Sequence, residues 1–185
     1  MDFELNQSSQ LTANGTTPVR TAGDILIKYD LDRGGTVPTL GFHRWVTTGN
    51  AATVCEASNT VPCWGKGTAV LTGGAAAVAL SSVVDPIRAL GQSSDRTLDA
   101  LTFGEASIDL QTSGIFTAGA CVSFGQAYLK SRSSSAFTSE IKDFIAPIGI
   151  SVSNCAPALI PNKAWVTASN VTARSDTGEI KVESP

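Results

Sequence analysis

The chain has 185 residues, which suits one domain, or one domain with a short appendage. Its formal net charge is −3 and no Lys/Arg run stands out, which argues against a nucleic-acid-binding protein. Only 16 % of the residues are charged, and the many Ser, Thr, Val and Gly residues favour strands and turns.

The beginning of the chain carries no targeting signal. Met1 is followed at once by Asp2 and Glu4, without the basic and apolar regions of a signal peptide. No apolar run reaches the roughly 20 residues that a membrane helix needs. We therefore expect no membrane insertion in this segment, and we expect it to be a piece of a longer protein.

The first strand pattern covers residues 24–31, where apolar side chains alternate with mostly polar ones. Residues 33–35, Arg-Gly-Gly, predict a turn. A second strand follows over 40–46, with His43 and Trp45 on the face opposite the other apolar residues. These segments together predict a half-buried strand pair.

The middle of the chain predicts a hairpin and then a loop. Residues 68–71 and 75–84 read as two strands about a turn at 73–74, Gly-Gly. Residues 85–99 are loop-like, with one helical turn near 86–90. Further strand patterns cover residues 106–110, 122–130 and 148–152.

Residues 135–144 are ambiguous, because Phe137, Ile141 and Phe144 fit helical spacing while the neighbouring segments are strands. We expect either a short helix or a bulged strand there. After a linker-like stretch, residues 165–172 and 179–182 predict a hairpin about a turn at 176–178.

This series of short strands predicts an all-β fold, an antiparallel β-sandwich or jelly roll with at most one or two short helices. We assign residues 1–155 to this domain. Residues 156–185 form a C-terminal hairpin or a linker into a following domain.

Four cysteines allow three disulfide pairings. Cys55 and Cys63 bracket a short loop, and Cys121 and Cys155 flank two strand patterns. The spacing favours Cys55–Cys63 and Cys121–Cys155. It does not fit a zinc site, which needs closer Cys pairs or His ligands. Two disulfides indicate an oxidising, extracytoplasmic compartment.

Seven segments form a joint pattern, namely residues 2–9, 14–26, 44–49, 63–66, 103–106, 123–134 and 137–147. Together they resemble an uncharacterised domain of large bacterial cell-surface proteins, which often precedes prealbumin-like (SpaA-type) stalk domains. The resemblance covers roughly residues 2 to 155. It implies a cell-wall-associated, adhesin-like setting and a non-catalytic role, and it supplies no catalytic residues.

Residues that suggest catalysis lack their partners. The chain has a single histidine, His43, and no Gly-x-Ser-x-Gly nucleophile elbow, which argues against a hydrolytic triad. Glu105 and Asp109 share a strand face but lie about 13 Å apart, too far for paired-carboxylate chemistry. We expect no enzyme activity.

Candidate binding and crosslinking residues remain. Four aspartates near predicted turns are of the type that binds calcium, but they match no calcium-loop motif: Asp30, Asp32, Asp95 and Asp99. We therefore predict no metal or other cofactor.

Trp45 and Trp64 are possible ligand-facing aromatics, with Tyr128 as a third; all three also suit a core. Lys28 or Lys130, with Glu105, would supply two of the three parts of a Lys–Asn isopeptide crosslink, whereas exposed lysines are the simpler reading.

We therefore predict a non-enzymatic, extracellular structural or adhesive module. The alternative is a domain that binds carbohydrate or another cell-surface ligand. The expected partners are other surface-protein domains, further copies of this chain, or cell-surface glycans.

Overall fold

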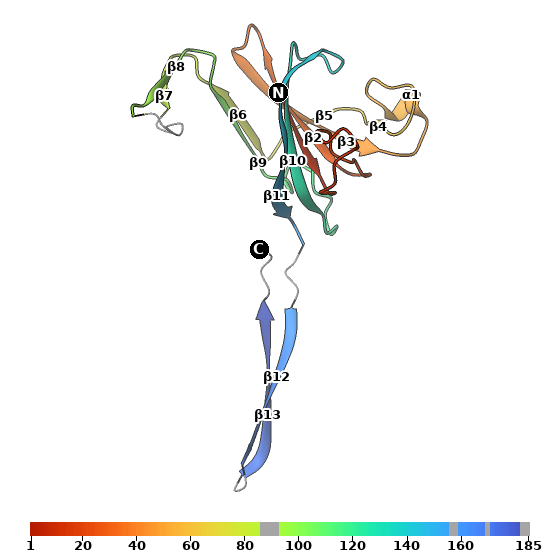
Figure 1. Cartoon of the computed structure of the whole chain (residues 1–185), viewed down its shortest axis with the longest axis vertical. Helices are drawn as coiled ribbons and strands as arrows, with labels where there is room; N and C mark the ends of the chain where they lie inside the picture. Colours follow the sequence, from red (N-terminus) through yellow and green to blue (C-terminus); the bar gives the residue numbers. More distant parts are fainter. Residues whose placement is uncertain (86–92, 156–158, 169–170, 182–185) are drawn as a thin grey trace.

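The computed structural model describes residues 1–85, 93–155, 159–168 and 171–181 (Figure 1). Its main element is one antiparallel sheet of seven strands, ordered β11-β10-β1-β2-β3-β4, with β5 also pairing with β3. These strands are β1 (Asp2–Asn6), β2 (Ile25–Asp32), β3 (Val37–Val46), β4 (Cys63–Trp64), β5 (Thr68–Ala69), β10 (Ser123–Arg132) and β11 (Ile141–Ser153). The predicted all-β, antiparallel fold is confirmed.

The first strand lies inside the sheet rather than at its edge. β1 pairs on one side with β2, where Leu5 lies opposite Ile25, and on the other side with β10. β2 returns as β3 through the predicted turn, in which Arg33, Gly34 and Gly35 all have positive φ. Glycine adopts that conformation without steric cost, so the Arg-Gly-Gly sequence allows a tight return.

One face of the sheet carries the apolar core. Ile25, Phe42 and Phe124 are at most 7 % exposed, and they pack against Ile115 and Phe116 from the segment between β9 and β10. The rings of Phe116 and Phe124 stack with their centroids 6.0 Å apart. Each such buried side chain contributes roughly 1.5–3 kcal/mol, so this cluster holds the connecting segment on the sheet.

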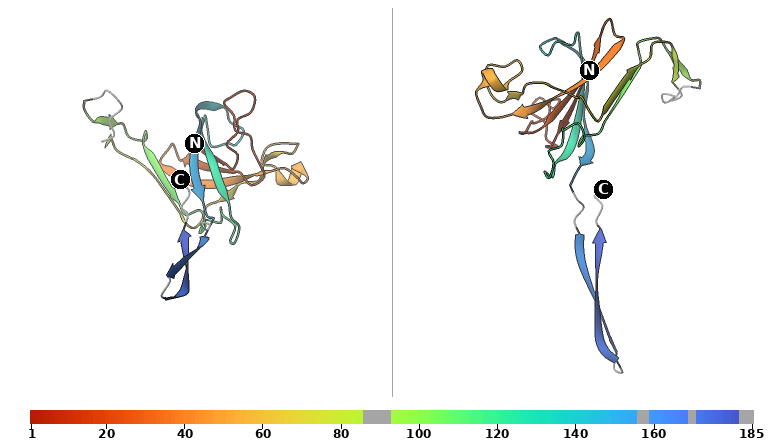
Figure 2. Two further views of the ribbon diagram at one scale, coloured as in Figure 1. Left: turned by 60° about the horizontal axis from the view of Figure 1, so that its bottom comes forward. Right: turned by 180° about the vertical axis from the view of Figure 1, so that it is seen from behind.

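Two smaller antiparallel pairs form an arm that leaves the main sheet (Figures 1 and 2). The first pair is β6 (Gly74–Val78) with β9 (Gly104–Ile108), and the second is β7 (Val83–Asp85) with β8 (Arg96–Leu98). The second pair corrects the prediction of a loop over 85–99. The helical turn predicted at 86–90 lies outside the described residues.

The predicted Gly73-Gly74 hairpin turn is wrong. β5 pairs with β3, and β6 pairs with β9, so the strands on either side of the two glycines do not pair with each other. Gly73 has a φ of +70°, and a Cβ on Gly74 would lie 2.6 Å from Val70 Cγ1. The glycines therefore permit a close crossing from the sheet into the arm.

The ambiguous segment resolves into a turn followed by a strand. Residues 133–140 form turns and bends, and β11 begins at Ile141. Within the described residues the one helix is α1 (Ala51–Val54), which begins after the cap Asn50. No helix in that part of the chain is long and apolar enough to cross a membrane.

The C-terminal strands β12 (Leu159–Ala168) and β13 (Val171–Lys181) pair with each other and, among the described residues, with no other strand. The sequence pattern predicts a hairpin here but misplaces its turn. Ala164 pairs with Asp176 and Ala168 with Val171, so residues 176–178 lie inside β13. The pairing of residues 176–178 with β12 outweighs the local turn preference of Asp-Thr-Gly.

Candidate functional site

A row of polar side chains on β1 is buried where a strand usually carries apolar ones. Asp2, Glu4 and Asn6 are at most 1 % exposed, whereas Phe3 between them is 40 % exposed. Successive strand residues point to opposite faces, so the three polar side chains share one face of the sheet. The register with β10 places Lys130 directly opposite Asp2.

Glu4 is the centre of this row. Its carboxylate accepts two hydrogen bonds from Arg20, from Nε at 2.6 Å and from Nη2 at 3.0 Å. Lys130 Nζ donates to Glu4 Oε2 at 2.7 Å, and Asn6 Nδ2 donates to Oε1 at 2.9 Å. A bidentate contact with an arginine, together with a hydrogen bond from a lysine ammonium, is among the stronger arrangements available to a buried carboxylate.

Arg132 extends the contacts between β1 and β10. Its Nε forms an ion pair with Asp2 Oδ2, and its Nη1 donates to the carbonyls of Phe137 and Ser139 at 2.7 and 3.1 Å. One side chain therefore joins the beginning of β1, the end of β10 and the turn that follows it.

Asp24 joins the other end of β1 to the loop before β2. This fully buried carboxylate accepts two hydrogen bonds from Gln7, two from Thr21 and one from Asn6, at 2.8–3.1 Å. Five donors offset the cost of burying the charge. The loop is thereby held over the polar face of the sheet.

We call these residues the β1 cluster: Asp2, Glu4, Asn6, Arg20, Asp24, Lys130 and Arg132. The cluster contains three carboxylates and three cationic side chains. Burial alone would raise the pKa of Glu4, but the hydrogen bonds from Arg20 and the charge of Lys130 outweigh it, so this pKa lies below its ordinary value. The cluster is thus a set of ion pairs that fix strands, and its central carboxylate is poorly suited to accept a proton.

The cluster also bears on the Lys–Asn isopeptide crosslink for which the sequence offers candidate residues. Lys130 contacts Glu4, and Lys28 contacts Asp30 and the Ser135 carbonyl, so the acid beside a buried lysine is Glu4. Asn6 and Lys130 both hydrogen-bond to Glu4. Lys130 lies opposite Asp2, and Asn6 is four residues further along β1, so the backbones of Lys130 and Asn6 are about 13 Å apart. Lysine and asparagine side chains together do not span that distance, so this arrangement gives no Lys130–Asn6 bond.

Both disulfide pairs favoured by the spacing are present. Cys55–Cys63 closes a loop of sequence separation 8 beside β4. Cys121–Cys155, with a separation of 34, joins the chain just before β10 to the chain just after β11. The described residues contain no free cysteine.

The two predicted ligand-facing aromatics lie together. Trp45 on β3 pairs with Trp64 on β4, and their rings meet edge-to-face with centroids 5.1 Å apart. Arg20 lies over both indoles, at 5.2 and 5.5 Å from their centroids. The Arg20 guanidinium therefore covers one face of each half-buried ring, and its hydrogen bonds with Glu4 link this aromatic pair to the β1 cluster.

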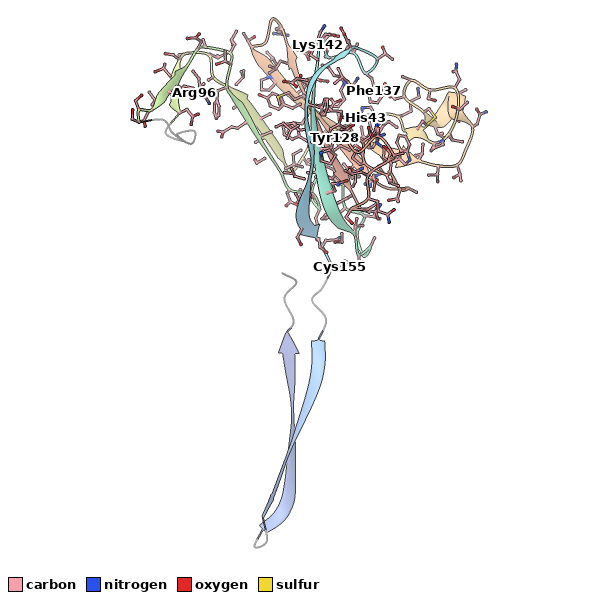
Figure 3. The ribbon with its side chains drawn as sticks, in the orientation of Figure 1. His43, Arg96, Tyr128, Phe137, Lys142 and Cys155 are labelled. Carbon is pink, nitrogen blue, oxygen red and sulfur yellow. A yellow bond between two sulfur atoms is a disulfide. The ribbon has the colours of Figure 1, made fainter. Side chains whose placement is uncertain are left out.

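The other candidate residues occupy separate places. His43 is buried, its Nδ1 lies 2.8 Å from the Gly65 carbonyl, and its ring is 4.6 Å from that of Phe137 (Figure 3). Asp109 caps a turn by accepting hydrogen bonds from Gln111 and Thr112, which hold its pKa below the ordinary value. In the described part of the chain no three His, Cys, Asp or Glu side chains are grouped to hold a metal ion.

The opposite, apolar face of the sheet is covered only in part by the arm. A cavity of about 500 Å³ lies between them, and Phe3, Leu31 and Leu101 line it while remaining 40 % exposed. The Tyr29 hydroxyl donates to the Ala77 carbonyl at 2.6 Å and holds the arm over this cavity.

Comparison with known protein families, with curated proteins and with solved structures finds no match to this chain.

Proposed function

We propose that this chain is a non-enzymatic, extracellular structural module of a bacterial surface protein, and that it transmits tension from one end of its sheet to the other. The observation that carries the proposal is the position of β1. This strand begins at one end of the sheet, lies between β2 and β10, and is joined to β10 by buried ion pairs.

The strand directions support this role. β1 and β10 are antiparallel, and so are β10 and β11, so β1 and β11 run the same way. The chain therefore begins β1 at one end of the sheet and completes β11 at the other. Figure 3 shows Lys142, near the beginning of β11, and Cys155, just after its end, at opposite ends of the domain.

Pulling on the two ends of such a domain slides β1 along its neighbours. Hydrogen bonds between antiparallel strands lie perpendicular to the strands, so a sliding force loads all of them together. The ion pairs Glu4–Lys130 and Asp2–Arg132 cross the same interface and resist the same movement. A domain of this kind suits a stalk or spacer under mechanical load.

The two disulfides support the extracellular part of the proposal, because such bonds persist in oxidising compartments. The adhesin-like, cell-wall-associated setting comes from the family resemblance in residues 2–155.

Single-molecule pulling from residues 1 and 185 tests the mechanical role. Lys130→Met removes an ammonium that bonds Glu4 across the interface, and we expect it to lower the unfolding force. Lys142→Met is the matched control, because Lys142 is 56 % exposed and pairs with the exposed Glu140. Equal forces for wild type and both variants, or no resolved unfolding event in wild type, would refute the proposal.

A second candidate function is binding of a cell-surface carbohydrate. It is favoured by the half-buried Trp45–Trp64 pair beside the Cys55–Cys63 loop, since aromatic rings pack against the apolar faces of sugars. A glycan array on which wild type gives a signal that Trp64→Ala loses would support it. An array without signal would remove it.

A further inference from the structure

The Cys121–Cys155 disulfide lies where the chain leaves the sheet. Cys121 precedes β10 by two residues and Cys155 follows β11 by two residues. The next pair inward, Ser123 with Ser153, is the first pair of the ladder between β10 and β11. Tension that reaches Cys155 from the following chain therefore has two routes into the domain. One runs along β11, and the other crosses the disulfide to Cys121 and the beginning of β10.

The route along β11 is mechanically the weaker one. Among the described strands β11 lies at the edge of the sheet and pairs with β10 alone, and its ladder has register shifts at three places. Pro147 within β11 has no N–H to donate. Ile145 and Ile148 are more than half exposed, so these two side chains add little packing that would resist sliding.

The interface between β10 and β1 is better secured. All five residues of β1 pair with β10 without a register shift, from Asp2↔Lys130 to Asn6↔Gln126. β1 is also held by β2 on its other side. Two ion pairs of the β1 cluster, Glu4–Lys130 and Asp2–Arg132, cross the β1–β10 interface, and neither of them reaches β11.

We propose that the Cys121–Cys155 disulfide passes tension around β11 directly to β10, so that the β1–β10 interface sets the mechanical strength of the domain. With the bond intact, β10 and β11 are tied at this end and cannot slide past each other. With the bond reduced, β11 carries the tension alone and detaches first. Redox state thus selects which interface fails, an inference that rests on the proposed tension-bearing function.

One variant pulled in two ways tests this directly. Cys155→Ser leaves Cys121 as the single free thiol, and Cys121 is exposed and able to take a handle. Pulled from residue 1 and the Cys121 thiol, the variant should unfold at the force of the oxidised wild type, because tension enters β10. Pulled from residues 1 and 185, the same molecule should fail at a lower force, with β11 detaching first.

Reduction of the wild-type chain supplies a second measurement, which also serves if the variant does not fold. A dithiol reagent, which is itself oxidised to a disulfide, opens both bonds of the wild type. Opening Cys121–Cys155 frees 34 residue steps, which adds about 12 nm of contour length, and opening Cys55–Cys63 frees 8, which adds about 3 nm. We expect the unfolding force to fall along with this gain. The Cys55→Ser/Cys63→Ser variant is the matched control, and it should keep the wild-type force, since Cys55–Cys63 lies outside the path from β1 to β11.

Equal unfolding forces from the two attachment points of Cys155→Ser would overturn the inference. So would a reduced wild type that gains the contour length without losing force. Failure of the proposed function has a different signature, namely an oxidised wild type with no resolved unfolding force.

Discussion

His43 shows how a single buried residue makes the stability of this domain depend on pH. Burial lowers its pKa, and the hydrogen bond with the Gly65 carbonyl opposes that shift only in part. The folded chain therefore holds a neutral imidazole at pH values where the unfolded chain already binds a proton. The contribution of His43 to stability is fully present above its unfolded pKa, about 6.5, and is lost as the pH falls toward the folded pKa.

We predict that the free energy of unfolding of the wild type decreases between pH 7 and pH 5, and that His43→Gln reduces this decrease. Urea denaturation at several pH values measures both slopes. Parallel pH profiles for the two proteins would show that His43 is not the responsible group.

The polar residues of β1 show why the sequence pattern alone misses an essential strand. Asp2, Glu4 and Asn6 alternate with Phe3 and Leu5, which is a strand period, but the polar side chains are the more completely buried ones. Hydrophobic periodicity assumes that apolar residues lie inside. The burial here depends on Arg20, Lys130 and Arg132, which are distant in sequence, so no local signal predicts it.

At the scale of single elements, the two disulfides should stabilise the domain unequally. In the chain-entropy description, a bond contributes more when it closes a longer loop. The 8-residue separation of Cys55–Cys63 corresponds to about 2.5 kcal/mol and the 34-residue separation of Cys121–Cys155 to about 4 kcal/mol.

We therefore expect Cys121→Ser/Cys155→Ser to lower the free energy of unfolding by more than Cys55→Ser/Cys63→Ser does. Chemical denaturation of both variants, beside the oxidised wild type, measures the difference. A larger loss in the Cys55/Cys63 variant would mean that native contacts of the short loop, rather than chain entropy, dominate.

Strands with local signals are predictable, and their partners are not. The alternation over 24–31 and the turn at 33–35 correctly place β2 and its return into β3. The Gly73-Gly74 pair has an equally strong turn signal, yet the strands on either side of it, β5 and β6, do not pair with each other. β5 pairs with β3 and β6 pairs with β9, and both partners are remote in sequence. Pairing depends on contacts of the whole sheet, which a local motif does not encode.

At the scale of the whole molecule, the sequence predicts the all-β class and the cysteine pairing. The cysteine spacing succeeds because loop length and strand position restrict the pairings. The β1 cluster escapes prediction, although it contains the buried carboxylates Asp2, Glu4 and Asp24 and the buried ion pairs of Glu4 and Asp2. It connects three segments that come together only in the completed fold, namely β1, the loop before β2, and β10.

The resistance of the sheet to tension should depend on the direction in which the tension is applied. Tension applied at residue 1 and beyond Cys155 slides β1 along β10, so the ladder and ion pairs are loaded together. Tension applied at residue 1 and at the turn after β10 opens the same two strands from one end, pair by pair. The same contacts should resist the first direction far better than the second.

The most direct test compares these two directions in one molecule. Ala136→Cys places an exposed thiol in the turn after β10, beside the beginning of β1. We predict that oxidised protein pulled from residues 1 and 185 unfolds at a clearly higher force than the same protein pulled from residues 1 and 136. Equal forces in the two directions would contradict the account, because the sheet would then have no preferred axis of strength.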